Sequence, residues 1–116
     1  MNKPLGPYTP AVRAGDFIYV SGQLGMTDGR LELGVAAQTT QAITNLAGQL
    51  EQLGASLADV VKTTCFLVDM DTFATFNEAY VRGFGDHRPA RSTVAVRELP
   101  ANGRVEIEAV AYRPVG

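Results

Sequence analysis

Apolar residues recur at spacings of three and four in two segments, and this period predicts two amphipathic helices. The first covers residues 35 to 53 and is followed by Gly54, which suits the position after a helix end. The second covers residues 72 to 85, with Asp71 as its expected N-cap. The two apolar stripes are Ile43, Leu46, Ala47, Leu50 and Leu53, and then Phe73, Phe76, Tyr80 and Phe84. Each helix therefore has one apolar side to bury.

Segments of alternating or β-branched residues predict the strands. Residues 12 to 23 form an expected hairpin, and a short strand is expected near residues 30 to 33. Residues 60 to 70 are almost continuously apolar, which is typical of a central strand. Residues 91 to 96 and 105 to 112 alternate in polarity. The element order predicts one α+β domain over residues 1 to 116, a mixed six-stranded sheet with both helices on one face.

The second face of this sheet is expected to be partly apolar. The alternation places Thr93, Ala95 and Val110 on it, between Arg91 and Glu106. A face of this kind on a small chain indicates burial against another subunit.

Composition excludes several classes of protein. The net charge of -2 and the pI of about 5.3 provide no attraction for nucleic acids or anionic membranes. No apolar run reaches a membrane-spanning length, and the N-terminus lacks the apolar core of a signal peptide, so a cytoplasmic protein is expected. With one histidine and one cysteine, a His/Cys metal site is not expected, and Cys65 is predicted to be a small buried hydrophobe.

Arg91 and the acidic pair Glu106 and Glu108 are candidates for chemistry. A guanidinium presents a planar fork of donors that suits bidentate binding of a carboxylate or phosphate; the alternative is an ordinary strand-edge ion pair. The two acids share one face of their strand. On a solvated face they are an ordinary polar pair, whereas on a buried face at least one needs a partner or a role.

Other motifs support less. Ser21 has no triad partner, because the single histidine, His87, falls in the loop before Pro89. The glycines after Ser21 match no phosphate-binding loop. Tyr8, after a proline, fills the core or lines a pocket.

Several ordered segments resemble the RidA/YjgF family of reactive intermediate deaminases. They are residues 6–8 (GPY), 17–23 (FIYVSGQ), 54–62 (GASLADVVK), 73–80 (FATFNEAY), 89–94 (PARSTV), 99–100 (LP) and 105–109 (VEIEA). Matches spread over nearly all of the chain are far more specific than one motif.

The resemblance implies a chorismate-mutase-like fold and a homotrimer with clefts between neighbouring subunits. It also implies hydrolysis of 2-aminoacrylate-type enamines, through their imines, to 2-keto acids and ammonia without a metal or organic cofactor. Two alternatives are a pathway-specific deaminase of a larger enamine and a non-catalytic trimer that binds small carboxylates. Nucleic-acid processing is disfavoured by the acidic pI and by the lack of aromatic and basic platforms.

The resemblance also assigns roles to residues. Arg91 matches the arginine that holds the substrate carboxylate, and Glu106 matches the acid that positions or activates water. The sequence positions of Tyr8 and Ser21 match pocket-lining ones, and the backbone of Gly22 matches a substrate contact. Thr93 stands where many relatives have cysteine; the family role there belongs to the backbone carbonyl, so threonine is expected to spare activity.

Overall fold

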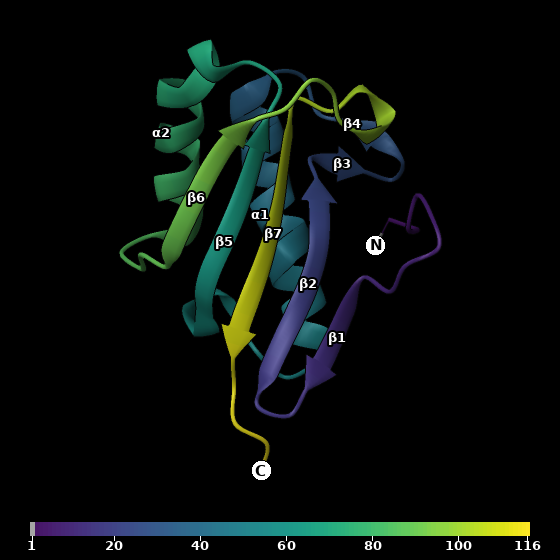
Figure 1. The fold of residues 1–116 in the computed structure, drawn as a ribbon, viewed down its shortest axis with the longest axis vertical. Coiled ribbons are helices and arrows are strands. Elements are labelled where there is room, and N and C mark those ends of the chain that lie inside the picture. The colour runs from purple at the N-terminus through teal and green to yellow at the C-terminus, as the bar shows by residue number, and fades with distance from the viewer. Residues whose placement is uncertain (1) are drawn as a thin grey trace.

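The computed structural model describes residues 2–116 and contains one mixed sheet of five strands in the order β1-β2-β7-β5-β6 (Figure 1). Only β5 and β6 pair in parallel; the other neighbours are antiparallel. The strands are β1 (Ala11–Ala14), β2 (Phe17–Leu24), β5 (Val60–Leu67), β6 (Ala90–Ala95) and β7 (Val105–Tyr112). β1 and β6 are therefore the two edges of the sheet.

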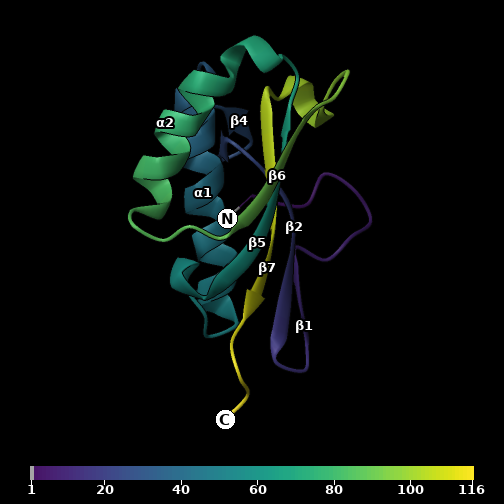
Figure 2. The same ribbon diagram turned by 60° about the vertical axis from the view of Figure 1, so that its left-hand side comes forward.

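Both α-helices pack on the same face of this sheet, as Figure 2 shows nearly edge-on. They are α1 (Val35–Gln52) and α2 (Phe73–Phe84), each within two residues of its predicted bounds. The predicted α+β class and the arrangement of helices on one face are confirmed.

The short strand predicted near residues 30 to 33 lies outside the main sheet, which therefore has five strands and not six. β4 (Arg30–Leu31) pairs with β3 (Met26–Thr27) in a separate two-stranded ribbon. The turn between them uses positive φ angles at Asp28 and Gly29, 51° and 81°, and returns the chain at once onto β3. This tight reversal explains why β4 pairs locally instead of extending the sheet.

Three 3₁₀ turns connect the larger elements: η1 (Leu57–Asp59), η2 (Met70–Thr72) and η3 (Pro100–Asn102). The second corrects the predicted cap of α2. The carboxylate of Asp69 accepts a hydrogen bond from the backbone N–H of Asp71, at 2.9 Å, and so caps η2. Asp71 already lies inside this turn, and α2 follows from Thr72 without a side-chain cap. The chain thus turns helical at η2, before the first residue of the apolar stripe that predicted α2.

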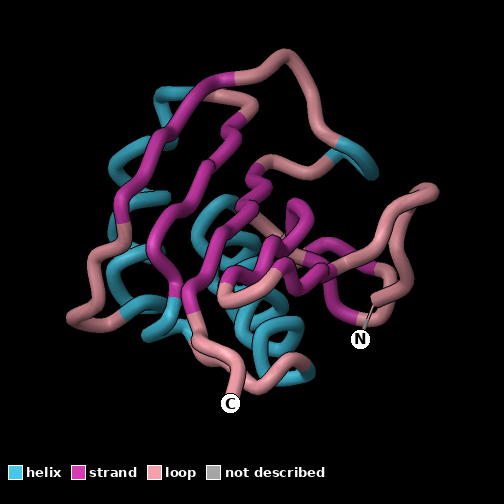
Figure 3. Tube along the Cα trace, turned by 60° about the horizontal axis from the view of Figure 1, so that its bottom comes forward, coloured by secondary structure: helices cyan, strands magenta, loops and turns pink. Residues whose placement is uncertain are grey.

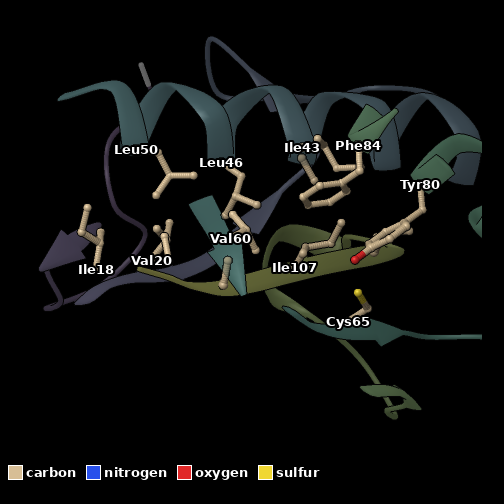
Figure 4. Close-up of a cluster of buried hydrophobic side chains, with 14 of the residues drawn as sticks. Ile18, Val20, Ile43, Leu46, Leu50, Val60, Cys65, Tyr80, Phe84 and Ile107 are labelled. Atoms are coloured by element: carbon tan, nitrogen blue, oxygen red, sulfur yellow. The ribbon is translucent and has the colours of Figure 1, made fainter. Parts of the chain in front are cut away.

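The core lies between the helices and the sheet (Figure 4). Its labelled members include Ile43, Leu46 and Leu50 of α1, Tyr80 and Phe84 of α2, and Ile18, Val20, Val60, Cys65 and Ile107 of the strands. Cys65 is fully buried, and burial raises the pKa of its thiol to about 11. The prediction of an inert, buried thiol is confirmed.

In the described chain no helix covers the opposite face of the sheet, and the N-terminal loop lies on that side (Figure 2). Large apolar side chains of β2 and β7 are exposed on this face. Phe17, Tyr19 and Tyr112 are 41%, 50% and 44% exposed. The rings of Phe17 and Tyr112 pack edge to face with centroids 5.2 Å apart. We call this surface the open face.

Candidate functional site

Four of the six predicted site residues line a single pocket. Tyr8, Ser21, Gly22 and Glu106 meet there, and Pro100 of η3 contributes to the wall. The N-terminal loop, purple in Figure 2, lies on the side of the sheet away from the helices and closes part of this pocket. The structure therefore brings together residues that are almost one hundred positions apart in the chain.

A bulge in β2 forms one wall of the pocket. The register between β2 and β7 shifts between Val20 and Gln23, at Ser21 and Gly22. The hydroxyl of Ser21 donates to the carbonyl of Thr9 at 2.7 Å. Bulges redirect side chains and leave ladder groups free for other partners. Here the backbone N–H of Ser21 also donates to the carbonyl of Pro10, at 2.8 Å, so two hydrogen bonds tie the N-terminal loop to β2 just after Tyr8.

Gly22 allows the carboxylate of Glu106 to lie directly against the backbone. A Cβ added at Gly22 would lie 2.7 Å from Cδ of Glu106, closer than real Cβ contacts. Burial, and secondly the neighbouring charge of Glu108, raise the pKa of Glu106. Within residues 2–116, Glu106 forms neither a hydrogen bond nor an ion pair. It is a half-buried acid whose oxygens remain available to a ligand or water.

We expect Glu106→Gln (E106Q) to raise the Tm at pH 7. The folded chain holds the proton of Glu106 more tightly than the unfolded chain, because its folded pKa is raised. The resulting stabilisation is present below the ordinary glutamate pKa and is lost as the pH rises through the raised value. Thermal denaturation of both proteins should show a higher Tm for E106Q at pH 7 and little difference below about pH 4.

The matched control for this prediction is Glu108→Gln, because Glu108 carries the same charge on the same strand face and is exposed. It should change the Tm less than E106Q does. A lower Tm for E106Q at neutral pH would contradict the prediction.

Arg91 lies elsewhere, near the start of the edge strand β6. Its register partner on β5 is Thr63, which is fully buried under the helices. The guanidinium carbon lies over three rings of α2, 4.8 Å from the ring centroid of Tyr80, 5.4 Å from that of Phe76 and 5.7 Å from that of Phe73. In the described chain the guanidinium has no hydrogen bond or ion pair. The alternative of an ordinary strand-edge ion pair is therefore wrong.

Arg91 and Glu106 lie on opposite faces of the sheet, which corrects the predicted assignment of both to one face. Arg91 and Thr93 are in register with Thr63 and Cys65, whose side chains face the helices. Glu106 is in register with Phe66, whose side chain alternates to the open face. The alternation of side chains along β6 was predicted correctly. The prediction was wrong in placing Arg91 of β6 on the same face as Glu106 of β7.

The distance between the two residues reinforces this separation. Glu106 is aligned through β5 with Val94, three residues along β6 from Arg91. Two strand spacings and three residue rises place the two Cα atoms about 14 Å apart. Figures 1 and 3 likewise show β6 and the N-terminal loop at opposite sides of the molecule. One small substrate cannot touch both side chains of the same chain.

Thr93 accompanies Arg91, not the Glu106 pocket. It lies two residues further along β6, on the same helix-facing side, in register with Cys65. The aromatic rings beneath Arg91 were predicted only as the apolar stripe of α2. One signal in the sequence could have identified these rings. They recur at helical spacing in the helix that directly precedes the strand with Arg91, and arginine commonly packs over aromatic rings.

No group of three or more His, Cys, Asp or Glu side chains between residues 2 and 116 could hold a metal ion. None of the helices described is both long and apolar enough to cross a membrane.

Comparisons with known proteins agree along nearly the whole chain. A family profile described as endoribonuclease L-PSP matches residues 1–113. The 2-iminobutanoate/2-iminopropanoate deaminase of Bos taurus is 44% identical over 112 residues, which cover 94% of this chain and 82% of that protein.

Solved structures give the same result. RidA from an Antarctic Psychrobacter superposes with a TM-score of 0.92 at 40% identity, covering 95% of this chain and 91% of that one. TdcF of E. coli, solved with bound serine, has a TM-score of 0.90 at 35% identity and covers 95% and 91%. Similarity in sequence and fold at this level, over this length, shows that the chain belongs to the endoribonuclease L-PSP family, the RidA/YjgF family that its motifs resemble.

Proposed function

We propose that this protein is a deaminase that hydrolyses enamine and imine acids of the 2-aminoacrylate type to 2-keto acids and ammonia. The observation that carries the proposal is a complementary pair of side chains without protein partners. Arg91 offers a guanidinium and Glu106 a half-buried carboxylate, and neither has a hydrogen bond or ion pair within residues 2–116. The names of the Bos taurus and Psychrobacter relatives support the same chemistry.

The working site would lie between two copies of the chain. Arg91 and Glu106 point to opposite faces, so a site that uses both needs Arg91 from one copy and Glu106 from a neighbour. The open face, with Phe17, Tyr19 and Tyr112 exposed, provides an apolar surface for self-association. A homotrimer would form three such sites by repeating one contact in a closed ring.

In the proposed mechanism, Arg91 fixes the substrate by its carboxylate. The guanidinium donates two parallel N–H bonds to the carboxylate oxygens while the aromatic rings of α2 cover one of its faces. The backbones of Thr93 and Gly22 lie on either side of the imine group of the substrate. Tyr8 and Ser21 line the wall of the pocket. This clamp makes the attack on the imine effectively intramolecular.

Glu106 then activates the attacking water. Its carboxylate accepts a proton as the water oxygen bonds to the imine carbon, and the imine nitrogen takes up a proton, which gives a tetrahedral carbinolamine. The protonated Glu106 returns its proton to the amine nitrogen, and the C–N bond breaks as ammonia leaves. The hydroxyl oxygen becomes the keto group and releases its proton to solvent, which replaces the proton that the imine nitrogen took up from solvent. The net change is imine acid plus water to keto acid plus ammonia. A raised pKa suits a group that must accept and return a proton.

A non-catalytic trimer that binds small carboxylates is the second candidate. The serine bound to TdcF favours it, because that ligand carries a carboxylate and is not an imine. The guanidinium of Arg91 would bind both kinds of ligand in the same way.

The decisive experiment measures pyruvate and ammonia release from freshly generated 2-aminoacrylate. Acceleration that saturates with substrate and rises with enzyme concentration supports the deaminase. Binding of serine or pyruvate without acceleration would establish the binding trimer instead. A larger enamine in the same panel tests the pathway-specific alternative. RNA cleavage that co-purifies with the protein and is lost in Arg91→Ala would favour a nuclease.

Gly22→Ala should lower kcat by about 10- to 100-fold while the chain stays folded. The added methyl group would displace the Glu106 side chain, and small misplacements of a catalytic group have effects of this size. Steady-state kinetics and thermal denaturation measure the two parts of the prediction. An active variant would mean that Glu106 need not occupy its observed position.

A further inference from the structure

The guanidinium of Arg91 has unusual surroundings for a ligand-binding arginine. The nearest of the three rings beneath it belongs to Tyr80, at 4.8 Å. Arginine residues that bind anions are commonly oriented by carboxylates, yet no such partner is present in the described chain. Aromatic rings leave all five N–H donors free, because they contact the flat face of the guanidinium and not its edges.

Tyr80 is itself held rigidly from two directions. Its hydroxyl and that of Thr63 lie 2.8 Å apart in a buried hydrogen bond. Thr63 is the register partner of Arg91, so the same rung of the sheet carries both the arginine and the anchor of the ring beneath it. On the other side the ring packs on Phe84, with centroids 4.7 Å apart. Figure 4 shows Tyr80 and Cys65 facing each other between α2 and the sheet.

Tyr80 also differs from the other rings in the way it is placed. It is only 4% exposed, whereas Phe73 is 39% exposed at the surface. Phe76 is fully buried but lies farther from the guanidinium, at 5.4 Å, and has no polar anchor. Of the three rings, Tyr80 alone combines the shortest distance to Arg91 with a hydrogen bond that fixes its orientation.

We infer that Tyr80 is a positioning residue: its ring, anchored by Thr63, holds the Arg91 guanidinium in the orientation that binds the substrate carboxylate. The inference rests on the proposed function, because it assigns a support to the proposed carboxylate clamp. It also gives the apolar stripe of α2 a second role: besides filling the core, the stripe orients the guanidinium of Arg91. Loss of the ring should therefore weaken ligand binding. Loss of the hydroxyl alone should have little effect on it, because the ring still packs on Phe84.

Kinetics of Tyr80→Leu (Y80L) and Tyr80→Phe (Y80F) test this inference. In Y80L we expect KM to rise about tenfold with kcat within about threefold of wild type, because the clamp holds the substrate and the transition state alike. In Y80F the ring remains, so KM should stay within about twofold even if the Tm falls. A rescue of KM by phenylalanine distinguishes a ring that orients Arg91 from a hydroxyl that only stabilises the fold.

Phe84→Leu (F84L) is the matched control, because Phe84 is a buried ring of the same helix that packs on Tyr80 and is not among the rings over Arg91. Its Tm should fall as in Y80L, while KM stays close to wild type, because the hydrogen bond to Thr63 still holds the Tyr80 ring. An equal rise of KM in F84L and Y80L, or no rise in Y80L, would overturn the inference. If Y80L does not fold, Tyr80→Met takes its place, because methionine also removes the ring and fills irregular space in a core.

Direct binding separates the failure of this inference from the failure of the proposed function. Calorimetric titration with pyruvate measures the dissociation constant even if the protein deaminates nothing. A weaker affinity in both Y80L and R91A, with Y80F unchanged, supports the positioning role whatever the activity. Loss of pyruvate binding in R91A with normal binding in Y80L would leave the clamp intact and reject the role of Tyr80.

Discussion

Replacing Arg91 with alanine (R91A) should lower kcat/KM for imine acids by roughly 10- to 150-fold while the protein stays folded. A charge-assisted bidentate pair contributes about 1.5–3 kcal/mol, and each 1.36 kcal/mol corresponds to about tenfold in rate. The fold should tolerate the change, because in the part of the chain described the guanidinium of Arg91 has no hydrogen bond or ion pair. Steady-state kinetics and thermal denaturation of the same preparation measure both parts.

Arg91→Lys is the matched control for this prediction. Lysine keeps the positive charge but presents a point charge in place of a planar fork, and it stacks less well on the rings of α2. Its kcat/KM should therefore fall between those of wild type and R91A. Full activity in R91A would exclude the carboxylate clamp, and equal activity in R91K and wild type would exclude bidentate geometry.

Mixing two impaired variants should restore activity. If each site takes Arg91 from one copy and Glu106 from another, R91A and E106Q subunits complement each other in mixed oligomers. Random assembly pairs an intact Arg91 with an intact Glu106 at about one quarter of the sites, so about one quarter of wild-type activity should return. This exceeds what either variant should show alone, because R91A is expected to keep about one tenth of wild-type kcat/KM at most, and loss of the proposed base in E106Q should lower kcat by about 100-fold or more. Refolding or co-expression of the two variants, followed by kinetics, provides the measurement.

The double variant R91A/E106Q provides the control for mixing. Combined with R91A it supplies no intact Arg91, so these mixed oligomers should recover nothing. Verified mixed oligomers of the two single variants that stay inactive would place the site within one chain, against the opposite orientation of the two side chains in the sheet. A monomeric wild type in sedimentation experiments would equally contradict a shared site.

Local patterns were sufficient for the elements and for the chemical character of the candidates. The stripes of α1 and α2 predicted both helices, because helical periodicity depends on neighbours three and four residues apart. Burial of Cys65 followed from its apolar surroundings in β5. Arg91 and Glu106 were recognisable because segments 89–94 and 105–109 resemble motifs of the RidA/YjgF family.

The relation between these residues required the tertiary structure. Which face a strand residue occupies depends on the register of its pairing, and β6 and β7 are aligned only through β5, about forty residues earlier in the chain. The same holds for the bulge at Ser21 and Gly22, the ribbon that removes β4 from the sheet, and the ring of Tyr80 beneath Arg91. Periodicity defines each element from within, whereas pairing between distant segments decides where side chains of different elements meet. The sequence thus identified Arg91 and Glu106 as candidates for binding and catalysis, and the sheet register placed them on opposite faces.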